Sequence, residues 1–92
     1  MFLEELDELI KDRKENPKEG AYTSSLFQKG RDRILKKIGE EAGEVIVAAK
    51  NADQLELKNE AADLLFHLMV TLREQNISIK DVDSLLRTRN QK

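Results

Sequence analysis

The sequence predicts an all-α fold, a four-helix antiparallel bundle, and three observations support it. Apolar residues recur at intervals of three and four through most of the chain, which is the periodicity of amphipathic helices. Charged residues make up 37% of the 92 residues and aromatic residues only 4%, a composition that gives little indication of sheet. Glycine and proline are few, so long segments are free of helix breakers.

The first predicted helix covers residues 2–15. Acidic residues lie early and basic residues late in this segment, which suits the helix dipole. A proline and a glycine then end the helix. The hydroxyl groups in the connection at residues 21–30 have two interpretations: they cap a short helical turn beginning near Ser24 or Ser25, or they bind phosphate or ribose oxygens.

The second principal helix is expected from residue 31 to about residue 50. Gly39 and Gly43 lie four residues apart on one of its faces, at a cost of up to about 1 kcal/mol each relative to alanine. Such a pair indicates the close approach of another backbone or of a ligand. A tight crossing with another helix is an equally good interpretation.

The third principal helix is predicted at residues 54–75 and the fourth after residue 78. Asp53, with Glu56 three residues later, is typical of a capping box that opens the third helix. Ser78, followed by Asp81, predicts a second cap of the same kind for the last helix.

Carboxylates interrupt the apolar pattern on both long helices. Glu41 and Glu44 project from one face of the helix at residues 31–50, with Glu40 at the edge of that face. The next helix is apolar around nearly its whole circumference, so we expect it to be buried. Its one polar stripe consists of Glu56, Glu60, Asp63 and His67. Buried carboxylates without a partner are unfavourable, so these acids require a cation.

A metal site would meet this requirement. The expected ligands are Glu41, Glu44, Glu60 and Asp63. Hard oxygen ligands favour Mg²⁺ or Mn²⁺ over zinc, and Mg²⁺ often shares its coordination with phosphate oxygens. The pattern therefore indicates metal-assisted hydrolysis of a polyphosphate, with a carboxylate accepting the proton of the attacking water. The alternative is that the acids at residues 40–44 form a solvated charged face.

Basic side chains flank the acidic stripe. Lys37 lies one turn before Glu41, Arg33 one turn earlier, and Lys29 at the start of the same helix. We expect them to bind substrate phosphates, although surface positions or salt bridges to the glutamates are alternatives. His67 has three interpretations: contact with the substrate base, a hydrogen bond to a ligand carboxylate, or a satisfied core histidine.

Charge and composition exclude several classes of partner. Sixteen basic and eighteen acidic residues give a net charge of −2, so we expect neither nucleic acid nor a membrane as partner. The absence of cysteine and of signal-peptide features suits a cytoplasmic protein. One small bundle cannot surround an apolar helix on every side, so we expect a homodimer with the helix at residues 54–75 near the interface.

The combination of these motifs resembles a known superfamily. Glu40, Glu41 and Glu44 followed by Glu60 and Asp63 resemble the motifs of MazG-like all-α nucleoside triphosphate pyrophosphatases. The flanking segments are more specific and resemble the phosphoribosyl-ATP pyrophosphatase family of histidine biosynthesis over essentially the whole chain. These segments are Tyr22-Thr23, Leu26-Phe27, Lys29-Gly30, residues 36–41, residues 48–51 and residues 60–68.

The resemblance implies magnesium-dependent hydrolysis of the α–β bond of phosphoribosyl-ATP by a cytoplasmic dimer, with residues 1–92 as a single domain without a fused cyclohydrolase. It implies that Glu40 is a further ligand or the base for water, and that Lys29 and Lys37 contact phosphate. The implied metal ligands are Glu41, Glu44, Glu60 and Asp63. The implied lid or ribose contacts include Tyr22, Thr23 and Ser24, although this chain has Ala21 where the family often has serine.

Two other functions fit parts of this pattern. A house-cleaning pyrophosphatase of the same superfamily, acting on non-standard or deoxy nucleotides, would carry the same carboxylates. A non-enzymatic helical dimerisation module would explain the apolar helix but would not require the acids. Release of pyrophosphate in the presence of Mg²⁺ separates the module from the two enzymes.

Overall fold

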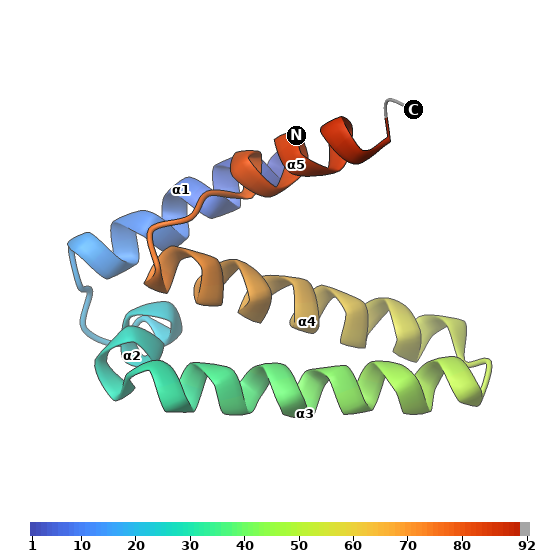
Figure 1. Ribbon diagram of the computed structural model, residues 1–92. Coiled ribbons are helices and arrows are strands. Elements are labelled where there is room, and N and C mark those ends of the chain that lie inside the picture. The colour runs from blue at the N-terminus through green and yellow to red at the C-terminus, as the bar shows by residue number, and fades with distance from the viewer. Residues whose placement is uncertain (91–92) are drawn as a thin grey trace.

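The computed structural model describes residues 1–90, and that part of the chain folds into five α-helices with no strand, which confirms the all-α prediction. The bounds of the helices are α1 Phe2–Glu15, α2 Tyr22–Lys29, α3 Arg31–Lys50, α4 Gln54–Glu74 and α5 Ile79–Arg89 (Figure 1). Four of them are the predicted principal helices, and α2 is a complete short helix where a single turn was predicted. None of the five helices is long and apolar enough to cross a membrane.

The predicted caps are confirmed at two positions and wrong at a third. Ser78 and Asp81 form a reciprocal capping box at the start of α5. Asp53 accepts a hydrogen bond from the backbone N–H of Glu56, which forms one half of the predicted box at α4. The predicted cap at Ser24 or Ser25 is wrong, because α2 begins earlier, with Ala21 at its N-cap position.

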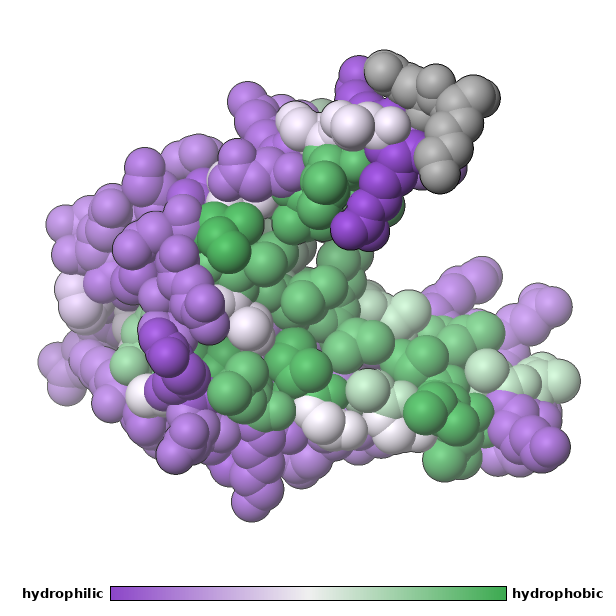
Figure 2. Space-filling view, viewed as in Figure 1, coloured by the Kyte–Doolittle hydropathy of each residue, from purple (hydrophilic) through white to green (hydrophobic). Residues whose placement is uncertain are grey.

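The molecule has the shape of a V. Helices α3 and α4 lie antiparallel along their lengths, and α2 packs at one end of this hairpin, against α1 and α3 (Figure 1). Only Gly30 separates α2 from α3, and its φ of 95° lies in a region that favours glycine. Helix α5 packs on α1, and together they diverge from the α3–α4 hairpin (Figures 1 and 2).

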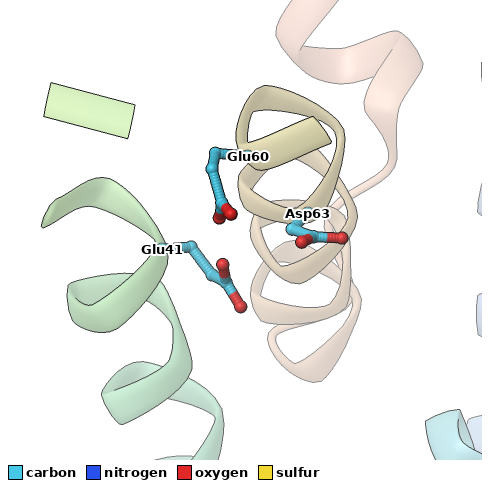
Figure 3. Close-up of side chains that lie close together, drawn as sticks. All are labelled: Glu41, Glu60 and Asp63. Atoms are coloured by element: carbon cyan, nitrogen blue, oxygen red, sulfur yellow. The ribbon is translucent and has the colours of Figure 1, made fainter. Parts of the chain in front are cut away.

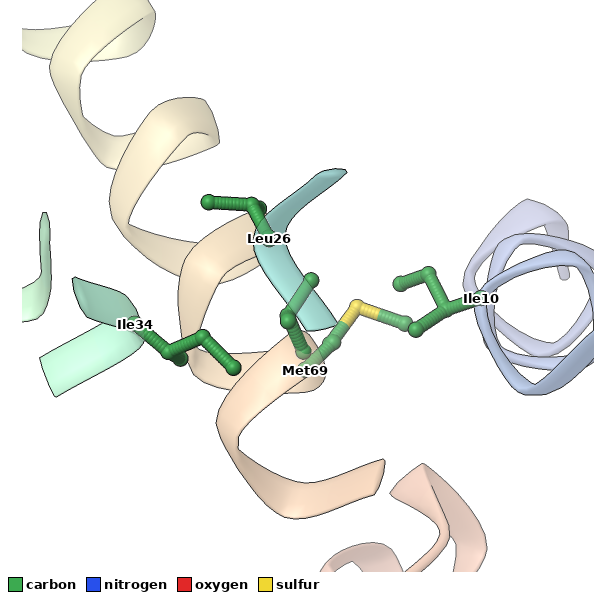
Figure 4. Packing of buried hydrophobic residues seen from close by; sticks show 5 residues of the cluster. Ile10, Leu26, Ile34 and Met69 are labelled. Carbon is green, nitrogen blue, oxygen red and sulfur yellow. The ribbon is translucent and has the colours of Figure 1, made fainter. Parts of the chain in front are cut away.

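The core lies where α1, α2, α3 and α4 meet, at the closed end of the V. Side chains from all four helices interdigitate there (Figure 4). The fully buried members are Ile10, Leu26, Ile34, Met69 and Val70. This core holds the start of α3 and the end of α4. The other end of the hairpin, where a loop of three residues joins the two helices, extends beyond the core.

Within one copy of the chain, α4 is not buried on all sides: Leu55 is 70% exposed and Leu68 41% exposed. The arm formed by α1 and α5 diverges from the first half of α4, where Leu55 lies (Figure 1). The predicted second copy would have to cover this apolar surface. Figure 2 shows hydrophobic residues gathered along the inner side of the V and toward the free end of the hairpin. No other segment within residues 1–90 approaches Gly39 or Gly43, so these glycines do not mark a helix crossing inside the chain.

Candidate metal centre

Three of the four predicted metal ligands converge between α3 and α4. Glu41 from α3 and Glu60 and Asp63 from α4 each offer one carboxylate oxygen, and these oxygens all lie within 4.8 Å of one another (Figure 3). Glu41 is buried, Glu60 is half-buried and Asp63 is exposed. The cluster therefore has one side against the helices and one side open to a ligand.

Two further carboxylates extend the cluster along the hairpin. Glu44 and Glu56 lie within hydrogen-bonding reach of Glu60, and this contact is the main reason that the pKa of Glu60 is raised to about 8. Glu44 thus lies beside the cluster, although it does not share the close set of three oxygens. Glu56 is predicted from the sequence only as part of the polar stripe and of the cap of α4. Its spacing of four residues from Glu60 is the signal that points to the site.

An open groove of about 620 Å³ adjoins these acids. Glu40, which is exposed on α3, lies on the wall of this groove together with Glu44 and Glu60. The remaining lining residues are Gly43, Val47, Ala48, Asn51, Asp53 and Glu56. The groove gives a ligand access to the carboxylates along the free end of the hairpin.

The electrostatics of the cluster fit a bound cation. Oε2 of Glu60 is buried and has no hydrogen-bond donor within residues 1–90. Burial raises the pKa of Glu41, and the neighbouring carboxylates of Glu44 and Asp63 raise it further. A divalent cation would satisfy the orphaned oxygen and offset this repulsion. Because all the donors are carboxylate oxygens, they match a hard divalent metal.

His67 lies directly beside the cluster and is itself buried. Its Nδ1 lies 2.8 Å from the backbone carbonyl oxygen of Asp63, which accepts hydrogen bonds only, so Nδ1 carries the proton. In the neutral ring Nε2 is then an acceptor, and the hydroxyl of Tyr22 donates to it at 2.9 Å. Nδ1 also lies 3.8 Å from Oε1 of Glu41. Both ring nitrogens of His67 therefore have partners inside the protein.

The three basic residues that are predicted to contact phosphate lie at the end of α2 and in the first two turns of α3. Lys37 and Arg33 are half-buried, one and two turns before Glu41 respectively, and Lys29 is exposed at the end of α2. Within residues 1–90 none of the three forms an ion pair, so the predicted alternative of salt bridges to Glu40 or Glu41 is wrong.

The hydroxyl-bearing residues of α2 have different environments. The hydroxyl of Ser24 donates to the carbonyl of Arg13 and accepts from the backbone N–H of Lys18, both at 3.0 Å. Ser24 is also buried, so the structure gives it a role in fixing the α1–α2 connection instead of the predicted contact with substrate. Thr23 is half-buried, and the ring of Tyr22 is 51% exposed.

Comparison with known proteins gives a consistent result. Residues 3–90 match the family described as phosphoribosyl-ATP pyrophosphohydrolase. The chain is 57% identical to the phosphoribosyl-ATP pyrophosphatase of Streptococcus thermophilus, over 99% of this chain and 88% of that protein. It is also 57% identical to the protein of the same name in Listeria welshimeri, over 99% of this chain and 87% of that one. The bifunctional histidine biosynthesis protein HisIE of Bacillus subtilis is 55% identical over 97% of this chain, which spans 43% of that longer protein.

Proposed function

Because the chain belongs to the phosphoribosyl-ATP pyrophosphohydrolase family, we propose that it hydrolyses phosphoribosyl-ATP to phosphoribosyl-AMP and pyrophosphate, an early step of histidine biosynthesis. The fold is the all-α type of the MazG-like pyrophosphatases. The proposal treats the chain as a single domain. The observation that carries the proposal is the convergence of Glu41, Glu60 and Asp63 in a chain that matches this family at residues 3–90.

The proposed cofactor is Mg²⁺, with Mn²⁺ as an alternative ion. Its ligands would be Glu41, Glu44, Glu60 and Asp63. The oxygen-only donor set and the orphaned Oε2 of Glu60 support this assignment. When bound, such an ion neutralises phosphate charge and lowers the pKa of a water molecule.

Glu40 is the proposed proton acceptor for the attacking water, or a further ligand. Its carboxylate is exposed on the wall of the groove and forms no ion pair within residues 1–90, so it is free to take a proton. Hydrolysis forms a bond between the water oxygen and phosphorus and breaks the α–β anhydride bond. The proton from the water passes to the carboxylate, and pyrophosphate leaves.

The basic residues before the cluster would hold the phosphates. Lys37 lies one turn from Glu41, with Arg33 one turn farther away and Lys29 at the end of α2. None of these three side chains forms an ion pair within the described part of the chain, so all three can bind phosphate oxygens. Thr23, on the first turn of α2, remains a proposed ribose contact.

The active form is proposed to be a cytoplasmic homodimer that acts on a small nucleotide. Ile46 is 68% exposed, Val47 59% and Leu55 70%, and all three lie toward the free end of the α3–α4 hairpin. A second copy of the chain would remove this apolar surface from water, which is favourable. The exposed faces of Gly39 and Gly43 leave room for a helix of that second copy.

A turnover assay tests the function. Purified protein with Mg²⁺ is given phosphoribosyl-ATP in parallel with a panel of ordinary, deoxy and non-standard nucleoside triphosphates, and pyrophosphate release is measured. We expect a clear preference for phosphoribosyl-ATP. Preference for a member of the panel would instead identify a house-cleaning pyrophosphatase. Absence of pyrophosphate release from every compound would leave a non-enzymatic dimerisation module.

A further inference from the structure

We propose that Tyr22 and His67 are positioning residues, which hold the His67 ring against the backbone of Asp63 and beside the carboxylate of Glu41 and do not contact the substrate. This inference rests on the proposed function, since it assigns the two residues to the same carboxylate site. It replaces the substrate contact predicted for Tyr22, and of the three interpretations given for His67 it sets aside contact with the substrate base. The hydrogen bonds of the His67 ring and the packing of the Tyr22 ring carry the argument.

The ring of His67 has no nitrogen left for a substrate. The residue is 5% exposed, Nδ1 donates to the carbonyl of Asp63, and Nε2 accepts from the hydroxyl of Tyr22. Nδ1 also lies 3.8 Å from Oε1 of Glu41. The ring is thus bonded to the backbone of one proposed ligand and lies beside the carboxylate of another.

Tyr22 fixes the orientation of the His67 ring. The Asp63 carbonyl accepts from Nδ1 and so places the proton on that nitrogen, and Nε2 then accepts from the hydroxyl of Tyr22. Loss of the hydroxyl would leave the tautomer in place but would leave Nε2 without its donor and free the ring to shift. The hydroxyl on α2 therefore holds an imidazole beside the carboxylates of α3 and α4.

Aromatic packing holds the two residues in this arrangement. The rings of Tyr22 and Phe66 are stacked, with centroids 6.3 Å apart and an interplanar angle of 28°. His67 meets both rings edge to face, at 6.0 Å from Tyr22 and 5.2 Å from Phe66. Because geometry of this kind is favourable in itself, the ring of Tyr22 should keep its place when only its hydroxyl is removed. The start of α2 is thereby fixed against α4 next to the metal centre.

The effect on metal binding follows from what outer hydrogen bonds do at other metal sites. Groups that orient the ligands typically contribute about 10-fold to 100-fold in metal affinity or activity. Tyr22 acts indirectly, through His67, so we expect its contribution to metal affinity to lie at the lower end of this range. We expect Tyr22→Phe to weaken the binding of a divalent metal about tenfold.

Three variants separate positioning from substrate contact. Tyr22→Phe removes the hydroxyl and keeps the ring against Phe66. His67→Asn keeps an amide donor near the place of Nδ1 and loses the acceptor for Tyr22. Thr71→Val is the matched control, because it removes a hydroxyl that donates to the backbone carbonyl of His67 at 2.8 Å and leaves the imidazole unchanged.

Three measurements are made on each protein. Long-range ¹H–¹⁵N NMR of the metal-free protein, at alkaline pH where a histidine ring is neutral, reports the tautomer of His67. Titration with Mn²⁺, followed by electron paramagnetic resonance, reports metal affinity. Steady-state kinetics report kcat, KM and the metal concentration required for activation.

Positioning predicts a ring protonated at Nδ1 in the wild type and in Tyr22→Phe, because the Asp63 carbonyl is kept, and about tenfold weaker Mn²⁺ binding in that variant. It also predicts no additional loss when Tyr22→Phe is combined with His67→Asn, and no change in Thr71→Val. The proposal is overturned if Tyr22→Phe leaves Mn²⁺ affinity unchanged, whether or not KM rises, or if the wild-type ring carries its proton on Nε2. If His67→Asn does not fold, the Tyr22→Phe results alone decide between positioning and substrate contact.

The same experiments separate failure of the proposed function from failure of the positioning proposal. A wild-type protein that binds Mn²⁺ but does not hydrolyse phosphoribosyl-ATP would refute the proposed function, and the metal affinities would still decide the positioning proposal.

Discussion

Arg73 of α4 and Asp7 of α1 form a bidentate ion pair inside the protein. Nε of Arg73 donates to Oδ1 of Asp7 at 2.9 Å, and Nη2 donates to Oδ2 at 2.7 Å. The side chains are only 10% and 5% exposed, respectively. Oδ2 also accepts the backbone N–H of Ile79 at 3.3 Å. One carboxylate thus connects α1 with α4 and with the start of α5, and it holds the two arms of the V together.

Asp7→Asn should destabilise the fold by about 3 kcal/mol, because it leaves the buried Arg73 guanidinium with only the more distant, exposed carboxylate of Glu8, at 3.6 Å, as a compensating charge. Urea unfolding followed by circular dichroism measures the loss. The matched control is Asp83→Asn, which breaks an exposed ion pair with Arg87 on α5 and should change stability little. Equal losses in the two variants would show that the buried pair has no special role.

The metal-free protein should lose stability as the pH rises. Glu60 has a pKa of about 8 in the folded state, above the ordinary value for a glutamate, so the folded state holds its proton more tightly than the unfolded state. This contribution is complete at pH values below the ordinary carboxyl pKa, and it is lost as the pH rises through about 8. Thermal unfolding between about pH 5 and about pH 9, without metal, measures the loss.

The control for the pH experiment is Glu60→Gln, which has no proton to lose at this position. Its melting temperature should fall less than that of the wild type over the same pH range. Saturating Mg²⁺ should also reduce the fall in the wild type, because a bound cation favours the ionised carboxylates. The same pH profile in both proteins would contradict the assignment of the titration to Glu60.

Glu60→Gln and Asp63→Asn should each lower kcat/KM by more than about 100-fold, since removal of a ligand is expected to exceed the effect of an outer hydrogen bond. The fold should persist, and the metal-free form of either variant should be at least as stable as the wild type, because like-charge repulsion is relieved. Steady-state kinetics and thermal unfolding measure the two effects. Glu5→Gln, an exposed change on α1, is the control. Full activity in Glu60→Gln would exclude Glu60 as an essential ligand.

Lys37→Ala should raise KM for phosphoribosyl-ATP about tenfold and leave the Mg²⁺ concentration for half-activation nearly unchanged. The reason is its place: Lys37 lies one turn from Glu41 but is not a member of the carboxylate cluster. Lys36→Ala, an exposed lysine one residue earlier, is the matched control. A parallel change in the Mg²⁺ requirement of Lys37→Ala would mean that the lysine supports the metal site instead.

The close set of carboxylates could be predicted from the sequence because it depends on local geometry. Spacings of three residues place Glu41 and Glu44 on one face of α3, and Glu60 and Asp63 on one face of α4. A connection of three residues between the two helices makes them antiparallel neighbours, so these faces meet. The separation of Glu44 from the close set of three oxygens depends on side-chain conformations that spacing does not specify.

Contacts between distant segments could not be predicted in this way. Asp7 is one of several acids near the start of α1, and only the fold brings Arg73 to it, 66 residues later. Tyr22 and His67 are likewise separated by 45 residues. The cover of α4 is a related case: an apolar circumference predicts that the helix avoids water, but it does not specify which chain covers it, and within one copy Leu55 and Leu68 are exposed.

The apolar surface that is exposed on the α3–α4 hairpin of a single copy predicts a dimer. Leu55→Asp should convert the protein from dimer to monomer, because it places a charge in apolar surface that the second copy would desolvate. Sedimentation velocity over a range of concentrations measures the change. Leu86→Asp is the matched control, since Leu86 is 51% exposed on the other arm of the V, on α5. A wild-type protein that is monomeric throughout the range would refute the dimer, and a dimer that persists in Leu55→Asp but not in Leu86→Asp would move the interface to the α1–α5 arm.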